Sequence, residues 1–266
     1  QELYDKGVRA FVVTELPDNL NIPEANIIEV KDSILAMQLL AAHHRKQFDI
    51  PVIGITGSNG KTIIKEWLYQ LLEPDFSIIR SPASYNSQIG VPLSVWKMAD
   101  THQMGIIEAG ISEPGEMERL EKVVQPTIGI FTNIGEAHQE GFLNRRHKVK
   151  EKLNLFVHSD LLIYCKDYPE INQSIVEFKG QFADDDDKKF DLFTWSRQSD
   201  DADMVITGVE KANGQAIIRA QYKEQEYSVT IPFSDEASIE NAIHCWATML
   251  YLGIPQNTAA LRLLKL

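Results

Sequence analysis

Short apolar stretches, each followed by a polar loop and an amphipathic segment, recur along the middle of the chain. The apolar stretches that we expect to form strands are residues 51–56, 76–80, 104–109, 127–133 and 160–165. The amphipathic segments that we expect to form helices are residues 61–72, 91–98, 115–124, 147–158 and 169–178. Strands and helices that alternate in this way predict an α/β fold with a doubly wound, mostly parallel sheet. Ligands bind beyond the carboxyl ends of the strands of such sheets.

The first part of the chain has a different pattern. Residues 8–13 and 27–30 predict two short strands, which are too little for a domain of their own. Because the chain also opens without a methionine, we expect residues 1–31 to be the tail of a longer N-terminal α/β domain. A helix is predicted over residues 32–48, with an apolar face formed by Ile34, Leu35, Met37, Leu39, Leu40 and Ala41.

The last part of the chain changes to alternating apolar and polar residues. This alternation covers residues 190–233 and surrounds Asn213-Gly214, a strong hairpin signal. We therefore expect antiparallel strands that extend one edge of the sheet. Two helices are predicted to follow, the first over residues 236–252 and the second from Pro255 to Leu266.

Composition narrows the classes of protein that fit. A length of 266 residues predicts about two domains, at roughly 150 residues per domain. The net charge of −12 argues against a nucleic-acid-binding face, and no apolar run reaches the roughly 18 residues that a membrane span needs. Cys165 and Cys245 lie in apolar patterns and are expected to be reduced core residues. We expect a cytoplasmic protein without membrane insertion.

Residues 53–62 form the most informative stretch, in which an apolar run ends in glycines and Lys61-Thr62 precede a helix. A loop of this kind binds phosphate, because backbone N–H groups and the positive end of the helix meet the same anion. The spacing TGxxGKT departs from GxxxxGK[ST], since Ile55 stands where the first glycine is expected. Lys61 would reach the outer phosphates and Thr62 would hold a magnesium ion. The alternative is a strand-to-helix turn with a surface lysine.

Polar residues at other strand ends could act with this loop. Glu108 ends an apolar strand, where a carboxylate needs a partner such as Mg²⁺ unless it lies just outside the strand on the surface. Asn133 and His138 follow the next strand, and His138 could bind metal or simply cap a loop. Asn86 lies in a polar loop before a helix and could hydrogen-bond phosphate or substrate, or be an ordinary loop residue.

Basic residues gather at the start of one predicted helix in this acidic chain. They are Arg145, Arg146, His147, Lys148, Lys150 and Lys152. Positive charge at a helix N-terminus opposes the helix dipole, so a bound anion would explain the cluster. A solvated basic face is the alternative.

These motifs together resemble the Mur ligases, the ATP-dependent amide-bond ligases of peptidoglycan synthesis. The resemblance rests on residues 56–62, Asn86 before residues 89–93, Glu108, and residues 132–138 in that order, and it covers essentially the whole chain. Residues 89–93 and 136–142 most resemble the members that join D-Ala-D-Ala to UDP-MurNAc-tripeptide. The resemblance implies ATP and Mg²⁺ as cofactors and these two molecules as substrates.

The resemblance also implies roles for individual residues. The nucleotide-binding residues would be Gly57, Ser58, Asn59, Gly60, Lys61, Thr62 and, on the adenine, Asn241. The magnesium site would comprise Thr62, Glu108, His138 and Lys152, the last as a carbamate, with Lys150 as the competing assignment. Lys61, Glu108, His138 and Lys152 would be catalytic, and Asn86 and Ser87 would contact substrate. One departure is that many relatives have His-Asn at Ala237-Ser238, which puts part of the adenine contact in doubt.

In domain terms, the resemblance implies that residues 1–48 are the remnant of a UDP-substrate-binding domain and residues 49–266 a central ATP-binding domain. A C-terminal domain normally follows in this family, so we expect the segment alone not to ligate. Sibling ligases, including folylpolyglutamate synthases, share the central domain and remain alternatives. A nucleotide-binding module without ligase activity is an alternative of another class, while the short loop argues against a P-loop kinase.

Overall fold

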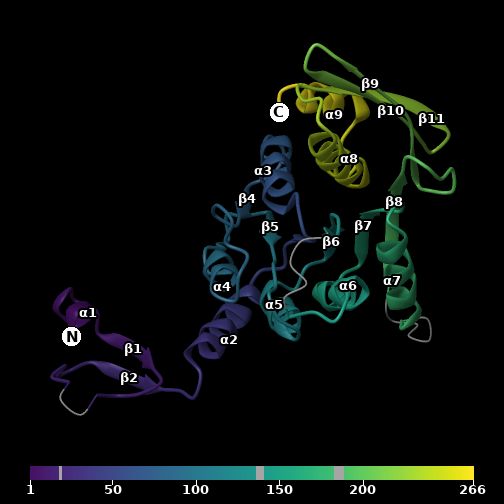
Figure 1. Ribbon diagram of the computed structural model, residues 1–266. Helices are drawn as coiled ribbons and strands as arrows, with labels where there is room; N and C mark the ends of the chain where they lie inside the picture. Colours follow the sequence, from purple (N-terminus) through teal and green to yellow (C-terminus); the bar gives the residue numbers. More distant parts are fainter. Residues whose placement is uncertain (18–19, 136–140, 183–188) are drawn as a thin grey trace.

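The computed structural model describes residues 1–17, 20–135, 141–182 and 189–266, and a nine-stranded sheet forms its centre (Figure 1). The strands lie in the order β11-β10-β9-β8-β7-β6-β3-β5-β4. In chain order they are β3 (Val52–Thr56), β4 (Ile78–Arg80), β5 (Met104–Glu108), β6 (Ile128–Phe131), β7 (Leu161–Cys165), β8 (Asp191–Ser196), β9 (Met204–Ala212), β10 (Gln215–Tyr222) and β11 (Gln225–Ile231).

The strands from β4 to β7 are parallel, as the apolar stretches predict. Ile53 of β3 lies opposite Ile106 of β5 on one side and Ile128 of β6 on the other. Every residue of β3, β5, β6 and β7 is buried, as expected for strands covered on both faces. The strand order reverses at β3, because β4 and β5 lie on one side and β6 and β7 on the other. The carboxyl end of β3 is therefore the place where a doubly wound sheet binds ligands.

Helices cover both faces of the sheet, each over its own hydrophobic core (Figure 1). One face carries α3 (Lys61–Leu72), α8 (Glu236–Tyr251) and α9 (Gln256–Leu263). The other face carries α4 (Gly90–Val95), α5 (Glu116–Val124), α6 (Arg145–Leu153), a short 3-10 helix (Asn154–Phe156) and α7 (Pro169–Gly180). The doubly wound α/β prediction is confirmed.

The C-terminal strands correct one part of the prediction. β8 pairs parallel with β7, and β9 pairs parallel with β8, so only β9, β10 and β11 are antiparallel. The predicted hairpin turn at Asn213-Gly214 is present, with φ of 53° and 78°. A second tight turn at Lys223-Glu224 has φ of 48° and 63°. The antiparallel extension of the sheet edge is thus confirmed, except that its first strand belongs to the parallel part.

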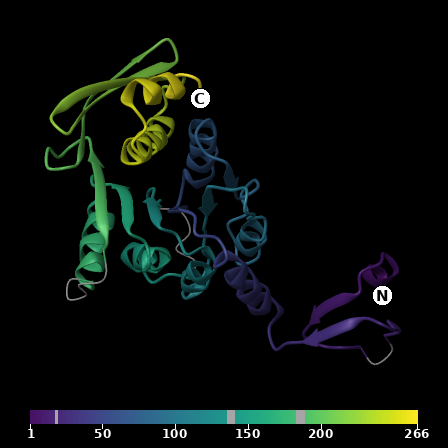
Figure 2. The ribbon, with the colours of Figure 1, turned by 180° about the vertical axis from the view of Figure 1, so that it is seen from behind.

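The N-terminal residues form a separate two-stranded parallel sheet, which lies away from the central sheet in both views (Figure 1, Figure 2). Its elements are α1 (Glu2–Asp5), which the sequence pattern does not predict, β1 (Ala10–Val13) and β2 (Asn26–Glu29). Helix α2 (Ser33–Arg45) follows and packs against α4 and α5. The proposed domain boundary after residue 48 stays a prediction, and α2 itself is held by the central domain.

The face that α2 buries matches the predicted one only at Ala41. Gln38, Ala41 and Arg45 face the central domain, whereas Leu39 and Leu40 are 62% and 51% exposed. Arg45 is buried because its guanidinium donates to the backbone carbonyl oxygens of Phe48, Ile50, Val124 and Gln125. These bonds replace water around the charge, so a polar face packs inward at this contact.

Two further expectations can be compared with the structure. Cys165 and Cys245 are both buried and free, as predicted for reduced core residues. Across the described ranges, no helix is both long enough and apolar enough to span a bilayer.

Candidate active site

The loop after β3 has the shape that phosphate binding requires. Residues 57–60, here called the phosphate loop, connect Thr56 at the end of β3 to Lys61 at the start of α3. Gly57 and Gly60 have φ of 137° and 83°, values that favour glycine. A Cβ atom at Gly57 would lie 2.0 Å from the Thr132 hydroxyl. Because Gly60 caps α3 without a side chain, the positive end of the helix is open to an anion.

The end of β6 holds the phosphate loop in place. The Thr132 hydroxyl donates to the carbonyl oxygen of Asn59 over 2.6 Å. The carbonyl oxygen of Asn133 accepts from the Ser58 N–H over 2.7 Å, and its side-chain oxygen accepts from the Asn59 N–H over 3.2 Å. Asn133 therefore lies at the predicted edge of the sheet, and it supports the loop directly.

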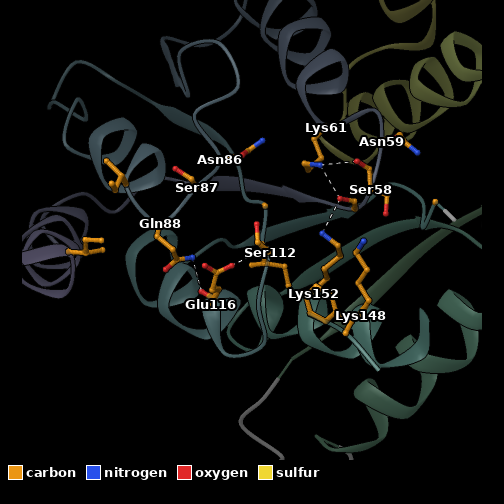
Figure 3. Close-up of a pocket in the computed structure, with 17 residues that line it drawn as sticks. Ser58, Asn59, Lys61, Asn86, Ser87, Gln88, Ser112, Glu116, Lys148 and Lys152 are labelled. Carbon is orange, nitrogen blue, oxygen red and sulfur yellow. Dashed lines mark hydrogen bonds between the residues drawn. The ribbon is translucent and has the colours of Figure 1, made fainter. Parts of the chain in front are cut away.

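A cavity of about 780 Å³ opens beside the phosphate loop (Figure 3). Its lining includes phosphate-loop residues 57–59 together with Lys61, Asn86, Ser87 and Lys152. The structure thus brings together most of the residues that the sequence singles out, from β3, from the loop before α4, and from α6. The cavity can hold a polyanion at the loop with a second ligand toward Asn86.

Glu108 lies behind Asn86 and is fully buried at the end of β5. Its Oε1 accepts a hydrogen bond of 3.1 Å from the Asn86 amide. Its Oε2 has no hydrogen-bond partner among the described residues. A buried carboxylate oxygen without a partner is costly, so this atom is a candidate ligand for a cation.

Two lysines converge on one carbonyl oxygen of the phosphate loop. Lys61 Nζ donates to the Gly57 oxygen over 3.0 Å and to the Ser58 oxygen over 3.1 Å, and Lys152 Nζ donates to the same Gly57 oxygen over 3.1 Å. Burial, aided by the positive charges of Lys61 and Lys148, lowers the pKa of Lys152 to about 7. Burial also lowers the pKa of Lys61, and the Glu108 carboxylate opposes that shift. Perturbed lysines in a cleft are typical of functional sites.

Geometry favours Lys152 over Lys150 as the site lysine. Lys152 is 3% exposed and lines the cavity. Lys150 lies on another side of α6, where its Nζ is 3.2 Å from Glu177 of α7 and its side chain is 53% exposed. Arg146 pairs with the same carboxylate. The basic cluster of the sequence is therefore divided between a solvated face and the cavity.

Thr62 and Asn241 lie outside the cavity lining. Thr62 is the second residue of α3 and is half-buried, outside the cavity lining. Asn241 of α8 packs against the phosphate loop, so closely that a Cβ atom at Gly60 would lie 2.3 Å from its Oδ1. Its contact with adenine stays a prediction. His138 lies outside the described residues.

The structure also reveals buried polar contacts that the sequence pattern does not single out. Gln38 of α2 donates to the backbone oxygen of Gln88 over 3.1 Å and to its side-chain oxygen over 2.9 Å. Gln88 in turn donates to the Glu116 backbone over 3.3 Å (Figure 3). Lys65, fully buried on α3, donates to the backbone oxygen of Ala83. A polar residue within the packed face of a helix, such as Gln38, is the sequence feature from which such contacts could have been predicted.

The comparisons with known proteins agree with this geometry. A family model described as the Mur ligase middle domain matches residues 55–249, more than half of the chain. The chain belongs to the Mur ligase family. The match spans the phosphate loop, Glu108, Lys152 and Asn241, whereas Ile34 of the cavity lining lies before the matched range.

Particular Mur ligases are similar over nearly all of the chain. The UDP-N-acetylmuramoyl-tripeptide--D-alanyl-D-alanine ligase of Bacillus subtilis (strain 168) is 27% identical over 98% of this chain and 54% of its own length. A crystal structure of MurF from Acinetobacter baumannii matches with a TM-score of 0.84 at 24% identity, covering 99% of this chain and 55% of that one. MurF from Thermotoga maritima, solved in complex with ADP, gives a TM-score of 0.84 at 23% identity, covering 100% and 58%. The chain therefore spans about half the length of these relatives, and it shares their fold.

Proposed function

We propose that this chain forms the ATP-binding and catalytic centre of a ligase that joins D-Ala-D-Ala to UDP-MurNAc-tripeptide. The observation that carries the proposal is the single cavity where the phosphate loop, Asn86 and Lys152 meet. The printed name of the Bacillus subtilis relative supports this choice of substrates. The matched MurF of Thermotoga maritima was solved with ADP, which supports a nucleotide at the loop.

The residues present fit a magnesium ion that arrives with the nucleotide. The orphaned Oε2 of Glu108 is the kind of hard oxygen ligand that Mg²⁺ prefers. Within the described part of the chain, no three His, Cys, Asp or Glu side chains cluster as a metal site, and Mg²⁺ commonly binds through one or two protein ligands and phosphate oxygens. Glu108 and Thr62 would hold the ion, with His138 and carbamylated Lys152 as the further ligands that the family resemblance implies. When bound, the ion would neutralise developing negative charge.

The protein groups have defined tasks in the proposed reaction. The tripeptide carboxylate attacks the γ-phosphorus of ATP, ADP leaves, and an acyl phosphate forms. The amine of D-Ala-D-Ala then attacks the acyl carbon, and phosphate leaves as the amide forms. Lys61 and the amino end of α3 stabilise the charge that develops on the phosphoryl oxygens. Asn86 orients Glu108 and, with Ser87, faces the cavity on the substrate side.

Phosphate release by the complete gene product tests the proposal. The assay supplies ATP, UDP-MurNAc-tripeptide and one candidate amine at a time. We expect release with D-Ala-D-Ala and none with single amino acids or glutamate. Lys61→Ala should abolish turnover, and undiminished turnover in that variant would contradict the mechanism.

Two other outcomes would favour the rival functions. Release that depends on a single amino acid would indicate a sibling ligase, and release that depends on glutamate a folylpolyglutamate synthase. Tight ATP binding with no amide product for any amine would indicate a nucleotide-binding module without ligase activity.

A further inference from the structure

A buried lysine lies one helical turn beyond Lys61. Lys65 is four residues further along α3, and its side chain is fully buried. Its ammonium group donates to the backbone carbonyl oxygen of Ala83 and lies 3.1 Å from a carboxylate oxygen of Glu66. An ammonium group removed from water is costly unless such partners stay in place. The charge of Lys65 therefore ties α3 to the segment that contains Ala83.

Ala83 has a backbone conformation that needs support. Its φ is 43°, in the left-handed region that favours glycine. A residue with a Cβ atom keeps such a conformation only where its surroundings hold it. Because Ala83 is exposed, burial of its own side chain does not hold it. The hydrogen bond from Lys65 to its carbonyl oxygen acts directly on the backbone and can supply that support.

Ala83 lies within the turns that lead to Asn86. The Tyr85 N–H donates to the carbonyl oxygen of Pro82 over 3.1 Å, in a turn that includes Ala83. The Asn86 N–H donates to the carbonyl oxygen of Ser84 over 2.8 Å, directly after it. A change in the backbone conformation of Ala83 would therefore displace Asn86.

Asn86 connects this segment to the candidate active site. Its amide donates to Glu108 over 3.1 Å, and its backbone oxygen accepts from the Gly110 N–H over 2.8 Å. Asn86 and Ser87 both line the cavity (Figure 3). The orientation of the buried carboxylate thus depends on the position of Asn86, and that position depends on the turns before it.

We propose that Lys65 is a positioning residue of the ligase, which holds Ala83 in its left-handed conformation and so places Asn86 against Glu108. This inference rests on the proposed function. Lys65 is outside the cavity lining, as far as the structure describes it, and acts through Asn86. The end of β6 holds the phosphate loop by separate hydrogen bonds. Loss of the Lys65 contact should therefore slow the reaction and leave nucleotide affinity nearly unchanged.

The first test compares Lys65→Met with wild type in the phosphate-release assay of the complete gene product. Methionine has a similar length and lacks both the charge and the donor. We expect kcat to fall at least about tenfold, the equivalent of one charge-assisted hydrogen bond, while the KM for ATP stays within about twofold. The stoichiometry of ADP binding measures the folded fraction and corrects kcat for it. Lys122→Met removes an exposed lysine of α5 and should match wild type.

Substitutions at exposed Ala83 test the same contact without a change in the core. Ala83→Val should lower kcat as Lys65→Met does, because a β-branched residue is strained at positive φ. Ala83→Gly in the Lys65→Met background should restore kcat about fivefold, because glycine adopts this conformation without the steric cost. Wild-type kcat in Ala83→Val or in Lys65→Met, or no recovery in the double variant, would overturn the proposal. A KM for ATP that rises tenfold would do so as well.

Hydrogen exchange separates this inference from the proposed function, because it needs no turnover. The Gly110 N–H, which donates to Asn86, should exchange faster in Lys65→Met, whereas the Ser58 N–H, which donates to Asn133, should keep its wild-type rate. If these rates are as expected but wild type releases no phosphate with any amine, the proposed function is wrong and the contact of Lys65 with the segment stands. If wild type ligates and exchange at Gly110 is unchanged in Lys65→Met, only the role of Lys65 is wrong.

Discussion

Lys152→Met should change how the stability of the chain depends on pH. The pKa of Lys152 falls from 10.5 to about 7 on folding, chiefly through burial. At 1.36 kcal/mol per unit, the charged lysine then costs the folded state about 5 kcal/mol. Methionine has similar length and no charge, so it removes this cost while it keeps most of the packing.

The sign of the effect follows from proton binding. Between about pH 7 and pH 10.5 the unfolded chain holds a proton on Lys152 that the folded chain has largely released. The free energy of unfolding therefore rises with pH across this window, and the Lys152 penalty is complete only below about pH 7. For a single site with these pKa values, the increase between pH 7.5 and pH 8.5 is about 1 kcal/mol. The Met variant should lack that increase.

Urea unfolding, followed by the fluorescence of buried Trp195 and Trp246, measures the difference at the two pH values. Lys150→Met is the control, because Lys150 is exposed beside Glu177 and its removal should leave the wild-type slope. All other titrating groups are common to the three proteins. If the Lys152→Met and wild-type curves run parallel from pH 7.5 to pH 8.5, Lys152 keeps an ordinary pKa and the electrostatic reasoning fails.

Four further substitutions test the phosphate loop, with a glycine control, and the contacts of α2. Gly57→Ala should cost at least about 2 kcal/mol in urea unfolding, because φ is 137° and the new Cβ would lie 2.0 Å from a threonine hydroxyl at the end of β6. Gly115→Ala, with φ of 81° and nothing within 4 Å, should cost only about 1 kcal/mol, and equal losses would contradict the clash. Arg45→Met should cost about 3 kcal/mol in the same assay, since it strips hydrogen bonds from four backbone carbonyls; a loss below 1 kcal/mol would show that water replaces them. Gln38→Leu should speed hydrogen exchange in the loop of residues 86–89 that it holds, and unchanged exchange would argue against that support.

The parallel part of the fold follows from the sequence because it uses strong local signals. Buried parallel strands need continuous apolar runs, and β3, β5, β6 and β7 have them. The phosphate loop is recognisable because its glycines and Lys61-Thr62 stand between a strand and a helix. Helix α3 accordingly begins and ends at the predicted residues 61 and 72.

Strand direction and helix rotation depend on contacts that a local pattern does not contain. Alternation predicts that β8 is a strand, but its direction relative to β7 is set by the path of the chain through α7. The hairpin turn at Lys223-Glu224 could not be predicted from the sequence, because two non-glycine residues adopt positive φ there. Gln38 and Arg45 of α2 face inward because their side chains donate hydrogen bonds to backbone carbonyl oxygens of the central domain.

The lysines of α6 show which part of the site could be predicted from residue spacing and which part needed the structure. Residues advance by about 100° around a helix, so Lys148 and Lys152 lie about 40° apart, while Lys150 lies about 160° from each. No rotation of the helix could therefore bring Lys150 to the phosphate loop together with either of the others. The spacing alone divides the cluster into one pair and one outlier. The spacing alone does not say which side of α6 faces the phosphate loop. Burial of Val149 and Leu153 fixes the rotation of the helix and so decides it. Assigning the site lysine to 152 thus also places Lys148 at the cavity, because the two residues share one side of α6.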